Sequence, residues 1–253
     1  MTDVHPGLVS TIIAVYNRPE LAAAHDRYWA LIHRNLHDLG EDSPEELSQS
    51  SDLFGAWTRS DLVLSQTCGM PYRLELKERV SLIGTPDFGL RGCPPGYYRS
   101  AIVVRTDDAR ETLGDFASAR LAYNELTSQS GYCALVNHVR PLGFWFAETR
   151  STGGHEASAH AVANGRADIA SLDAVSWGLL QRHDPLAVQL RVLDWTAPTP
   201  GLPYISRIGA NVDMLFEAIR SAIHGLDPID RQALGLRDLV SIPASAYLAV
   251  PNP

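Results

Sequence analysis

The fold is decided by residues 120–132, which read RLAYNELTSQSGY. Residues 120–124 have the composition of a short strand, and apolar side chains recur at helical spacing over residues 132–139. The loop between them, residues 128–131, contains serines of the kind that begin helices. The stretch therefore predicts a strand that leads through a polar loop into a helix, which is the repeating unit of α/β proteins.

The same unit recurs in both directions along the chain. A β-branched run at residues 11–16 precedes a predicted helix over residues 21–39, and Gly40 follows as its expected left-handed C-cap. Further strands are predicted at residues 61–67, 80–84, 99–105, 167–172 and 190–193, and further helices at 155–162 and 212–223. Strands that alternate with helices predict an α/β fold with mainly parallel sheets.

Composition narrows the class of partner. The 253 residues are 45% apolar and 20% charged, which is typical of a globular protein. With 21 Lys and Arg against 29 Asp and Glu, the formal net charge of -8 provides no basic field for a polyanion, so no nucleic-acid partner is expected. An anionic ligand must therefore be small.

The chain carries no export or membrane signal as written. Its apolar stretches are strand-sized, well below the roughly 20 residues of a transmembrane helix, so we expect no membrane insertion. No positively charged segment followed by an apolar run opens the sequence, which predicts a cytoplasmic protein, or a periplasmic one if an export signal is missing from this chain. Three cysteines are too few and too scattered for a thiolate zinc site.

Polar side chains follow the predicted strands at their carboxyl ends, where ligands collect in open α/β sheets. Residues at such positions come from both halves of the chain: Tyr16, Thr67, Cys68, Ser128, Ser130 and Asp173. A cleft between two lobes would bring them together around one small molecule.

The sharpest signal is the loop Ser128-Gln129-Ser130-Gly131. Two hydroxyls, a glycine and the first N–H groups of a helix can all donate to one oxyanion. A plain serine N-cap uses the same donors, so the pattern is compatible with both roles.

His155 and Asp173 are the next candidates. His155 lies in the first turn of its predicted helix, where it can donate to an anion, ligate a metal or simply lie on the surface. Asp173 ends a strand and is either the N-cap of residues 174–180 or a ligand acceptor. Because an ionised carboxylate only accepts, it would favour a ligand that bears a P–OH or ammonium group over a fully ionised oxyanion.

Two other chemistries can be assembled from these residues. Cys68, His155 and Asp173 could form a hydrolase triad, although no nucleophile signature surrounds Cys68, which could equally pair with Cys93. A ferric site is the other alternative, since Fe(III) suits phenolate and carboxylate oxygens; its ligands would be Tyr16, Tyr97 or Tyr98, His155 and Asp173. No ligand-spacing motif supports it.

The chain resembles the phosphate/phosphite/phosphonate solute-binding proteins of ABC transporters, the phosphonate-binding branch of the type II periplasmic-binding fold. The segments that carry this resemblance are spread over most of the chain: residues 61–69, 98–105, 123–132, 152–158, 162–170 and Asp173.

The resemblance implies a two-lobed fold in which each lobe is a mainly parallel sheet flanked by helices. The chain would cross between lobes near residues 98–102 and 198–204, which gives a discontinuous lobe of residues 1–98 plus 202–253 and a second lobe of residues 99–201. Ligand-facing residues would come from both lobes: Tyr16, Thr67, Cys68 and Gly69 from the first, and Ser128, Gln129, Ser130, Gly131, His155 and Asp173 from the second.

The implied function is a solute-binding protein that holds a small phosphonate-like or phosphate-like oxyanion, for ABC-type uptake or for sensing. We expect a monomer without catalytic residues, cofactor or metal, with an ABC permease as the implied partner. The alternatives are a cytosolic enzyme that uses Cys68, His155 and Asp173, and the ferric-ion binder.

Overall fold

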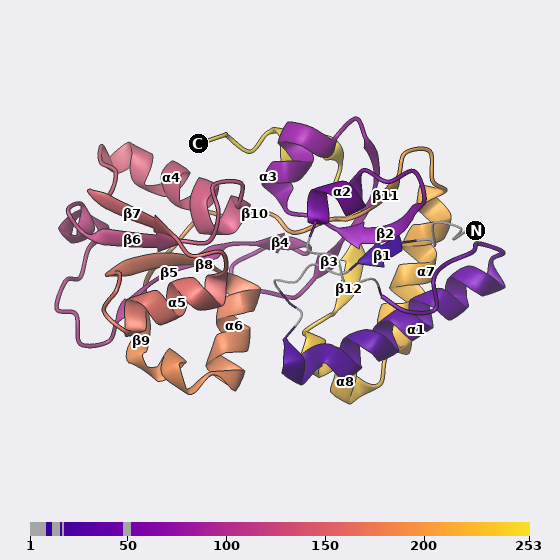
Figure 1. Ribbon diagram of the computed structural model, residues 1–253, viewed down its shortest axis with the longest axis horizontal. Helices are drawn as coiled ribbons and strands as arrows, with labels where there is room; N and C mark the ends of the chain where they lie inside the picture. The colour runs from indigo at the N-terminus through magenta and orange to yellow at the C-terminus, as the bar shows by residue number, and fades with distance from the viewer. Residues whose placement is uncertain (1–8, 12–15, 17, 48–51) are drawn as a thin grey trace, which may run out of the picture. The chain divides into compact units, whose positions relative to one another are not determined.

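The computed structural model describes residues 9–11, 16, 18–47 and 52–253. It divides into two compact units (Figure 1). Unit 1 comprises Met1–Gly89 and Pro200–Tyr247, and unit 2 comprises Leu90–Thr199 and Leu248–Pro253. The last residues belong to unit 2 because the Pro251 carbonyl accepts hydrogen bonds from Cys133 Sγ at 3.2 Å and Asn137 Nδ2 at 2.9 Å.

Unit 1 is built on a five-stranded sheet with the strand order β1-β2-β11-β3-β12. Its strands are β1 (Val9–Thr11), β2 (Leu62–Gln66), β3 (Val80–Asp87), β11 (Tyr204–Arg207) and β12 (Asp238–Val240). Its helices are η1 (Pro19–Leu21), α1 (Ala22–Asp38), α2 (Leu53–Trp57), α3 (Gly69–Pro71), η2 (Tyr72–Leu76), α7 (Val212–Gly225), α8 (Pro228–Leu234) and α9 (Ala244–Leu248).

Unit 2 is built on a second five-stranded sheet with the order β7-β6-β8-β5-β9. Its strands are β5 (Ser100–Arg105), β6 (Arg120–Tyr123), β7 (Glu148–Ser151), β8 (Ile169–Asp173) and β9 (Leu190–Trp195). Its helices are η3 (Leu113–Phe116), η4 (Gln129–Cys133), α4 (Ala134–Val139), η5 (Arg140–Leu142), α5 (His155–Ala163), α6 (Ala174–His183) and η6 (Pro185–Gln189). The short strands β4 (Tyr97–Tyr98) and β10 (Thr199–Pro200) pair with each other.

Both sheets are mixed, so the prediction of mainly parallel sheets is wrong. In unit 1, β1 and β2 are parallel, whereas β11 runs against β2 and β3, and β12 runs against β3. In unit 2, β6 is parallel to β7 and β8, whereas β5 runs against β8 and β9. A connection through a helix makes two neighbouring strands parallel. Strand β5 does not pair with β6, the next strand along the chain, and its actual neighbours β8 and β9 run antiparallel to it.

In unit 1, α1, β2 and β3 begin within one residue of the helix and strands predicted at residues 21–39, 61–67 and 80–84. The apolar repeat of α1 places Tyr28, Ile32 and Leu36 in the core, while Leu39 at its end is 54% exposed. Gly40 has the expected positive φ of 78°. Residues 12–15 of the predicted strand at 11–16 lie outside the described residues.

The sheet of unit 2 is covered on both faces. Alternate residues of β5 point to opposite sides: Ala101 and Val103 join the cluster that contains residues of α5 and α6, and Ile102 and Val104 join the cluster that contains Leu135 of α4. Figure 1 shows α4 on one side of this sheet and α5 and α6 on the other. A strand buried on both faces reads as a continuous apolar run, which is what residues 101–104 are.

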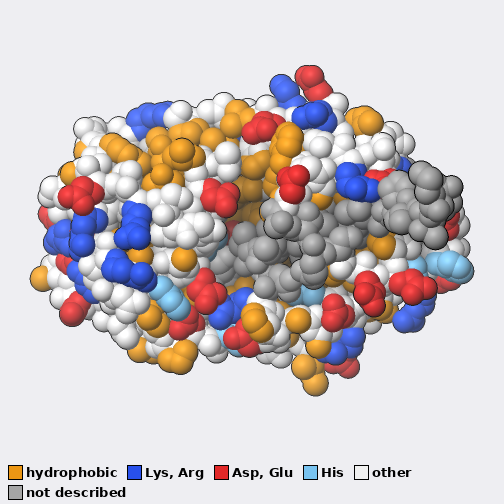
Figure 2. All heavy atoms as spheres, in the orientation of Figure 1, with side chains coloured by type: hydrophobic (Ala, Val, Ile, Leu, Met, Phe, Trp, Pro, Cys, Tyr) orange, Lys and Arg blue, Asp and Glu red, His pale blue; other side chains and the backbone are white. Residues whose placement is uncertain are grey.

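The surface carries charges of both signs. Lys and Arg side chains are interspersed with Asp and Glu over the face drawn in Figure 2. Among the described residues, no helix is both long enough and apolar enough to span a lipid bilayer.

Candidate anion-binding site

Three helices of unit 2 begin at the same edge of its sheet. Strands β6, β7 and β8 are parallel neighbours, and each leads directly into a helix: β6 into η4 and α4, β7 into α5, and β8 into α6. Carboxyl ends of parallel strands meet at one edge, so the N-termini of these helices gather there. Their first N–H groups have no partners within the helix, and the helix dipoles add positive potential, which favours an anion at this edge.

The loop after β6 is attached to the sheet through one carbonyl group. The Ser130 carbonyl oxygen accepts a hydrogen bond from Ser171 Oγ at 2.7 Å and another from Ser100 Oγ at 2.9 Å. Ser100 and Ser171 lie on β5 and β8 and are at most 1% exposed. These two bonds hold the first turn of η4 against the sheet.

The predicted serine loop forms the start of that turn. Ser128 is the N-cap of η4, and its Oγ accepts from Gly131 N at 3.0 Å, which leaves the Ser128 hydroxyl proton able to donate. Gln129 and Ser130 are buried beside it. The N-cap role and the anion-donor role are therefore compatible at Ser128.

Gly131 is required by a close approach of neighbouring side chains. A Cβ at this position would lie 1.9 Å from Asn124 Oδ1 and 3.2 Å from His155 Cε1. Asn124 Oδ1 is itself buried and has no hydrogen-bond partner among the described residues. The absence of a side chain at Gly131 thus allows an amide oxygen and an imidazole to meet the serine loop.

His155 faces this loop from the first turn of α5. Its Nε2 lies 3.1 Å from Ser130 Oγ, and its ring is buried. Burial lowers the pKa of His155 from 6.5 to about 4, although the Ser171 backbone acts in the opposite direction. The imidazole is therefore neutral near pH 7, which corrects the alternative of a surface histidine.

The tautomer of His155 decides what Ser130 offers to a ligand. If Nδ1 carries the proton, Nε2 accepts from the Ser130 hydroxyl, and Ser130 presents only lone pairs. If Nε2 carries it, the ring donates and the Ser130 proton is left for an oxyanion. The pair can thus match either a P–OH or a P–O⁻ group.

Asp173 is the N-cap of α6, one of the two roles predicted for it. Its Oδ1 accepts from Val175 N at 2.7 Å and from Ser176 N at 3.1 Å, and the residue is 1% exposed. Asp173 pairs with Ser100 across β8 and β5, so it lies beside the strand position that holds the serine loop. Ser176 Oγ, one turn further along, is buried without a hydrogen-bond partner among the described residues.

Three of the four candidates of unit 1 directly follow β2, and the fourth, Tyr16, precedes η1. Thr67 is fully buried, and its N–H donates to the Pro203 carbonyl at 3.0 Å, while its Oγ1 has no hydrogen-bond partner in the described part of the chain. Cys68 and Gly69 begin α3, with no side-chain cap on that helix. Tyr16 is buried, with its ring packed edge-on against Phe88 at a centroid distance of 5.5 Å.

The hydrolase triad is not supported by these partners. His155 Nε2 is engaged with Ser130, and the Oδ1 of Asp173 is engaged with the backbone of α6. All three cysteines are reduced thiols, so the Cys68–Cys93 disulfide is absent. Burial raises the pKa of the Cys93 thiol.

Three residues of the site were not singled out from the sequence as ligand-facing or supporting groups: Ser100, Ser171 and Asn124. The usable signal was a hydroxyl residue within an apolar strand, as in the segments SAIVV (100–104) and IASLD (169–173). A buried hydroxyl requires a partner, and here that partner is the serine loop.

Comparison with known proteins identifies the family of this chain. The model of the family described as "ABC transporter, phosphonate, periplasmic substrate-binding protein" matches residues 74–243, which is more than half of the chain. The chain belongs to this family. Members of the family are substrate-binding components of transporters rather than enzymes, so this chain has a solute-binding role. None of the curated proteins matches it in sequence.

Solved structures confirm the periplasmic-binding-protein type of α/β fold. PhnD1 from Prochlorococcus marinus, in complex with methylphosphonate, is 14% identical with a TM-score of 0.71, and the match covers 95% of this chain and 94% of that one. XAC2383 from Xanthomonas citri, bound to ATP, is 17% identical with a TM-score of 0.70, over 94% and 92% of the two chains. A binding-protein component of an ABC phosphonate transporter from Pseudomonas aeruginosa is 17% identical with a TM-score of 0.66, over 93% and 81%.

The packing of Gly131 can be tested by adding one methyl group. We expect Gly131→Ala to lower the free energy of unfolding by about 1–3 kcal/mol, because the new Cβ overlaps Asn124 Oδ1. Urea titration of both proteins measures the change. Gly178→Ala is the control, since a Cβ there meets no atom within 4 Å in the middle of α6 and should leave stability equal or higher. Adding Asn124→Ala to Gly131→Ala should restore part of the loss, and a fully stable Gly131→Ala variant would contradict the steric argument.

The buried His155 should make folding sensitive to acid. Its folded pKa of about 4 lies below the ordinary value of 6.5, so between these pH values the unfolded chain binds a proton that the folded chain does not. Stability should therefore fall as the pH drops from 6.5 toward 4, by up to about 3 kcal/mol from this group.

We expect His155→Gln to reduce that pH dependence, as measured by urea unfolding at several pH values from 7 to 4. His183→Gln, which alters an exposed histidine of the same unit, is the control and should keep the wild-type dependence. An unchanged slope in His155→Gln would mean that the ring is not buried in its neutral form.

Proposed function

We propose that this chain binds a small oxyanion of the phosphonate or phosphate type without chemically changing it. The observation that carries the proposal is the serine turn, whose Ser130 carbonyl is held by two strand hydroxyls while the Ser128 hydroxyl, which accepts from Gly131 N, keeps its proton for donation. The first turn of α5 adds further N–H groups, because its N-cap Gly154 supplies no side-chain oxygen to cap them. The methylphosphonate complex of PhnD1, which has the same fold, makes this ligand class the first to test.

We propose that the two units are the lobes of a ligand clamp. The division predicted from the sequence, residues 1–98 plus 202–253 and residues 99–201, differs from the two units mainly at residues 90–98 and 248–253, which lie in unit 2. Each unit would contribute donors from its strand ends. Thr67, Cys68, Gly69 and Tyr16 would face the ligand from one lobe, and Ser128, Gln129, Ser130, Gly131, His155 and Asp173 from the other. The buried Thr67 hydroxyl supports this reading, because a buried O–H needs an acceptor and none lies among the described residues.

The proposed setting is delivery of the ligand to an ABC permease by a monomeric protein. The family is periplasmic, and the proposed location is the periplasm.

Binding is tested by calorimetric titration of the purified protein with methylphosphonate, 2-aminoethylphosphonate, phosphate, phosphite and sulfate. We expect saturable binding of at least one phosphorus oxyanion, and phosphorus NMR of the mixture should show the ligand unchanged. Ser130→Ala should weaken binding by about tenfold or more, since a hydrogen bond to a charged group contributes roughly 1.5–3 kcal/mol.

The control for this titration is Ser118→Ala, an exposed serine at the opposite, amino end of β6, which should bind as the wild type does. A panel without binding, or equal affinities for Ser130→Ala and the wild type, would refute the oxyanion proposal. A new phosphorus signal would identify an enzyme instead.

Asp173 should select the protonation state of the ligand. If its carboxylate accepts from a P–OH group, affinity should fall as the ligand loses that proton, and sulfate should bind poorly. Asp173→Asn can both donate and accept, so it should reduce the preference for protonated phosphonate over sulfate by about tenfold, and an Asn side chain can still cap α6. Titrations of both ligands at several pH values measure this preference. If affinity and pH dependence stay unchanged, Asp173 acts only as a helix cap.

A further inference from the structure

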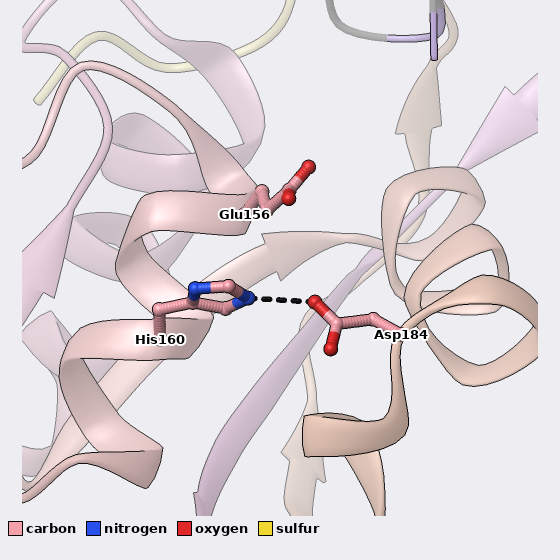
Figure 3. Close-up of side chains that lie close together, drawn as sticks. All are labelled: Glu156, His160 and Asp184. Carbon is pink, nitrogen blue, oxygen red and sulfur yellow. Dashed lines mark hydrogen bonds and ion pairs between the residues drawn. The ribbon is translucent and has the colours of Figure 1, made fainter. Parts of the chain in front are cut away.

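Unit 2 carries a cluster of side chains that could ligate a metal ion, two of them on α5 after His155 and one after α6. Figure 3 shows Glu156 and His160 on α5, with His160 pointing toward Asp184, which directly follows α6. One ligand atom from each of the three residues lies within 4.8 Å of the other two. The anion site described above uses none of these side chains.

The backbone holds the three groups in a defined arrangement. Glu156 and His160 are four residues apart in a helix and therefore share one face. The carboxylate of Asp184 is fixed at both oxygens: Oδ1 accepts from Leu186 N at 2.9 Å, and Oδ2 lies 2.6 Å from His160 Nε2. For all three to reach one ion, the exposed Glu156 carboxylate has to turn, and the hydrogen bond between His160 and Asp184 has to open so that both atoms can face the ion.

Solvent access is adequate for an ion to enter. The side chain of His160 is 36% exposed and that of Asp184 is 12% exposed. The site is thus open on one side, where water could complete the coordination shell.

The donor set selects the class of ion. One imidazole nitrogen and two carboxylate oxygens suit zinc and similar divalent transition ions, whereas calcium and magnesium prefer oxygen ligands alone. Binding requires that Nε2 of His160 give up the proton shared with Asp184 and that the ring keep its proton at Nδ1.

Two other histidine–carboxylate pairs among the described residues lack a third ligand. His138 Nε2 lies 2.9 Å from Asp194 Oδ2, and His224 Nε2 lies 3.0 Å from Asp238 Oδ1. In the part of the chain that the structure describes, the cluster of Glu156, His160 and Asp184 is the one group of three such residues with converging ligand atoms.

We infer that Glu156, His160 and Asp184 form a binding site for a divalent transition-metal ion of the zinc type. The ion would cross-link α5 to the segment after α6. Helices α5 and α6 both begin at the candidate anion site, and the ion would connect α5 to the residue that directly follows the C-terminal end of α6.

The test is calorimetric titration of metal-stripped protein with zinc chloride near pH 7. We expect one zinc ion per chain and a rise in the unfolding temperature on its addition. His160→Gln and Glu156→Gln should each weaken zinc binding by about tenfold or more. Cobalt added in place of zinc should produce visible absorption bands that both variants reduce.

The matched control is His138→Gln, which breaks a histidine–carboxylate pair of similar geometry without a third ligand and should bind zinc as the wild type does. Circular dichroism without metal establishes that each variant is folded, and the exposed Glu156→Gln provides the test if His160→Gln is not. The inference is overturned if the wild type shows no saturable zinc binding, if Glu156→Gln binds as tightly as the wild type, or if His138→Gln weakens binding equally. Oxyanion affinity does not enter these readouts, so the two proposals fail independently.

Discussion

The candidate site depends on one carbonyl oxygen and the two hydroxyls that hold it. Ser100 and Ser171 donate to the Ser130 carbonyl from neighbouring strands inside the sheet. Both hydroxyls would be costly to bury without an acceptor, and the carbonyl would be costly to bury without a donor, so each side stabilises the other. The turn that begins η4 is consequently fixed to the sheet by buried side-chain hydrogen bonds.

The groups around the serine turn are mostly uncharged hydrogen-bond donors. The ionisable groups predicted to face the ligand from this unit are a histidine that burial keeps uncharged and an aspartate whose Oδ1 accepts from two backbone N–H groups. Most of the direct contacts available to a ligand are therefore hydroxyls and backbone N–H groups. A hydroxyl can accept from a P–OH group as well as donate to a P–O⁻ group, so it can respond to the ligand's own protons, whereas lysine and arginine only donate.

The sequence predicted the elements well and their pairing poorly. Helix starts and strand lengths follow from local patterns, so the strands at 100–105, 120–123 and 169–173 and the C-cap at Gly40 were found. Strand direction is a non-local property, and the antiparallel insertion of β5 leaves no mark in the sequence of that strand. The serine loop was predicted because it follows a predicted strand, and His155 because it opens a predicted helix; the strand β7 before His155 was missed. The roles of Ser100, Ser171 and Asn124 were not predictable, because they depend on which strands are neighbours.

The direction of β5 has a mechanical consequence. Since β5 runs against β8, its first residue rather than its last stands at the edge where the helices begin, and Ser100 follows β4 after only one intervening residue. A torsional change at Arg99 would move the Ser100 hydroxyl and, with it, the Ser130 carbonyl. Strand β4, which directly precedes Arg99, is thereby linked to the serine turn through the Ser100 side chain.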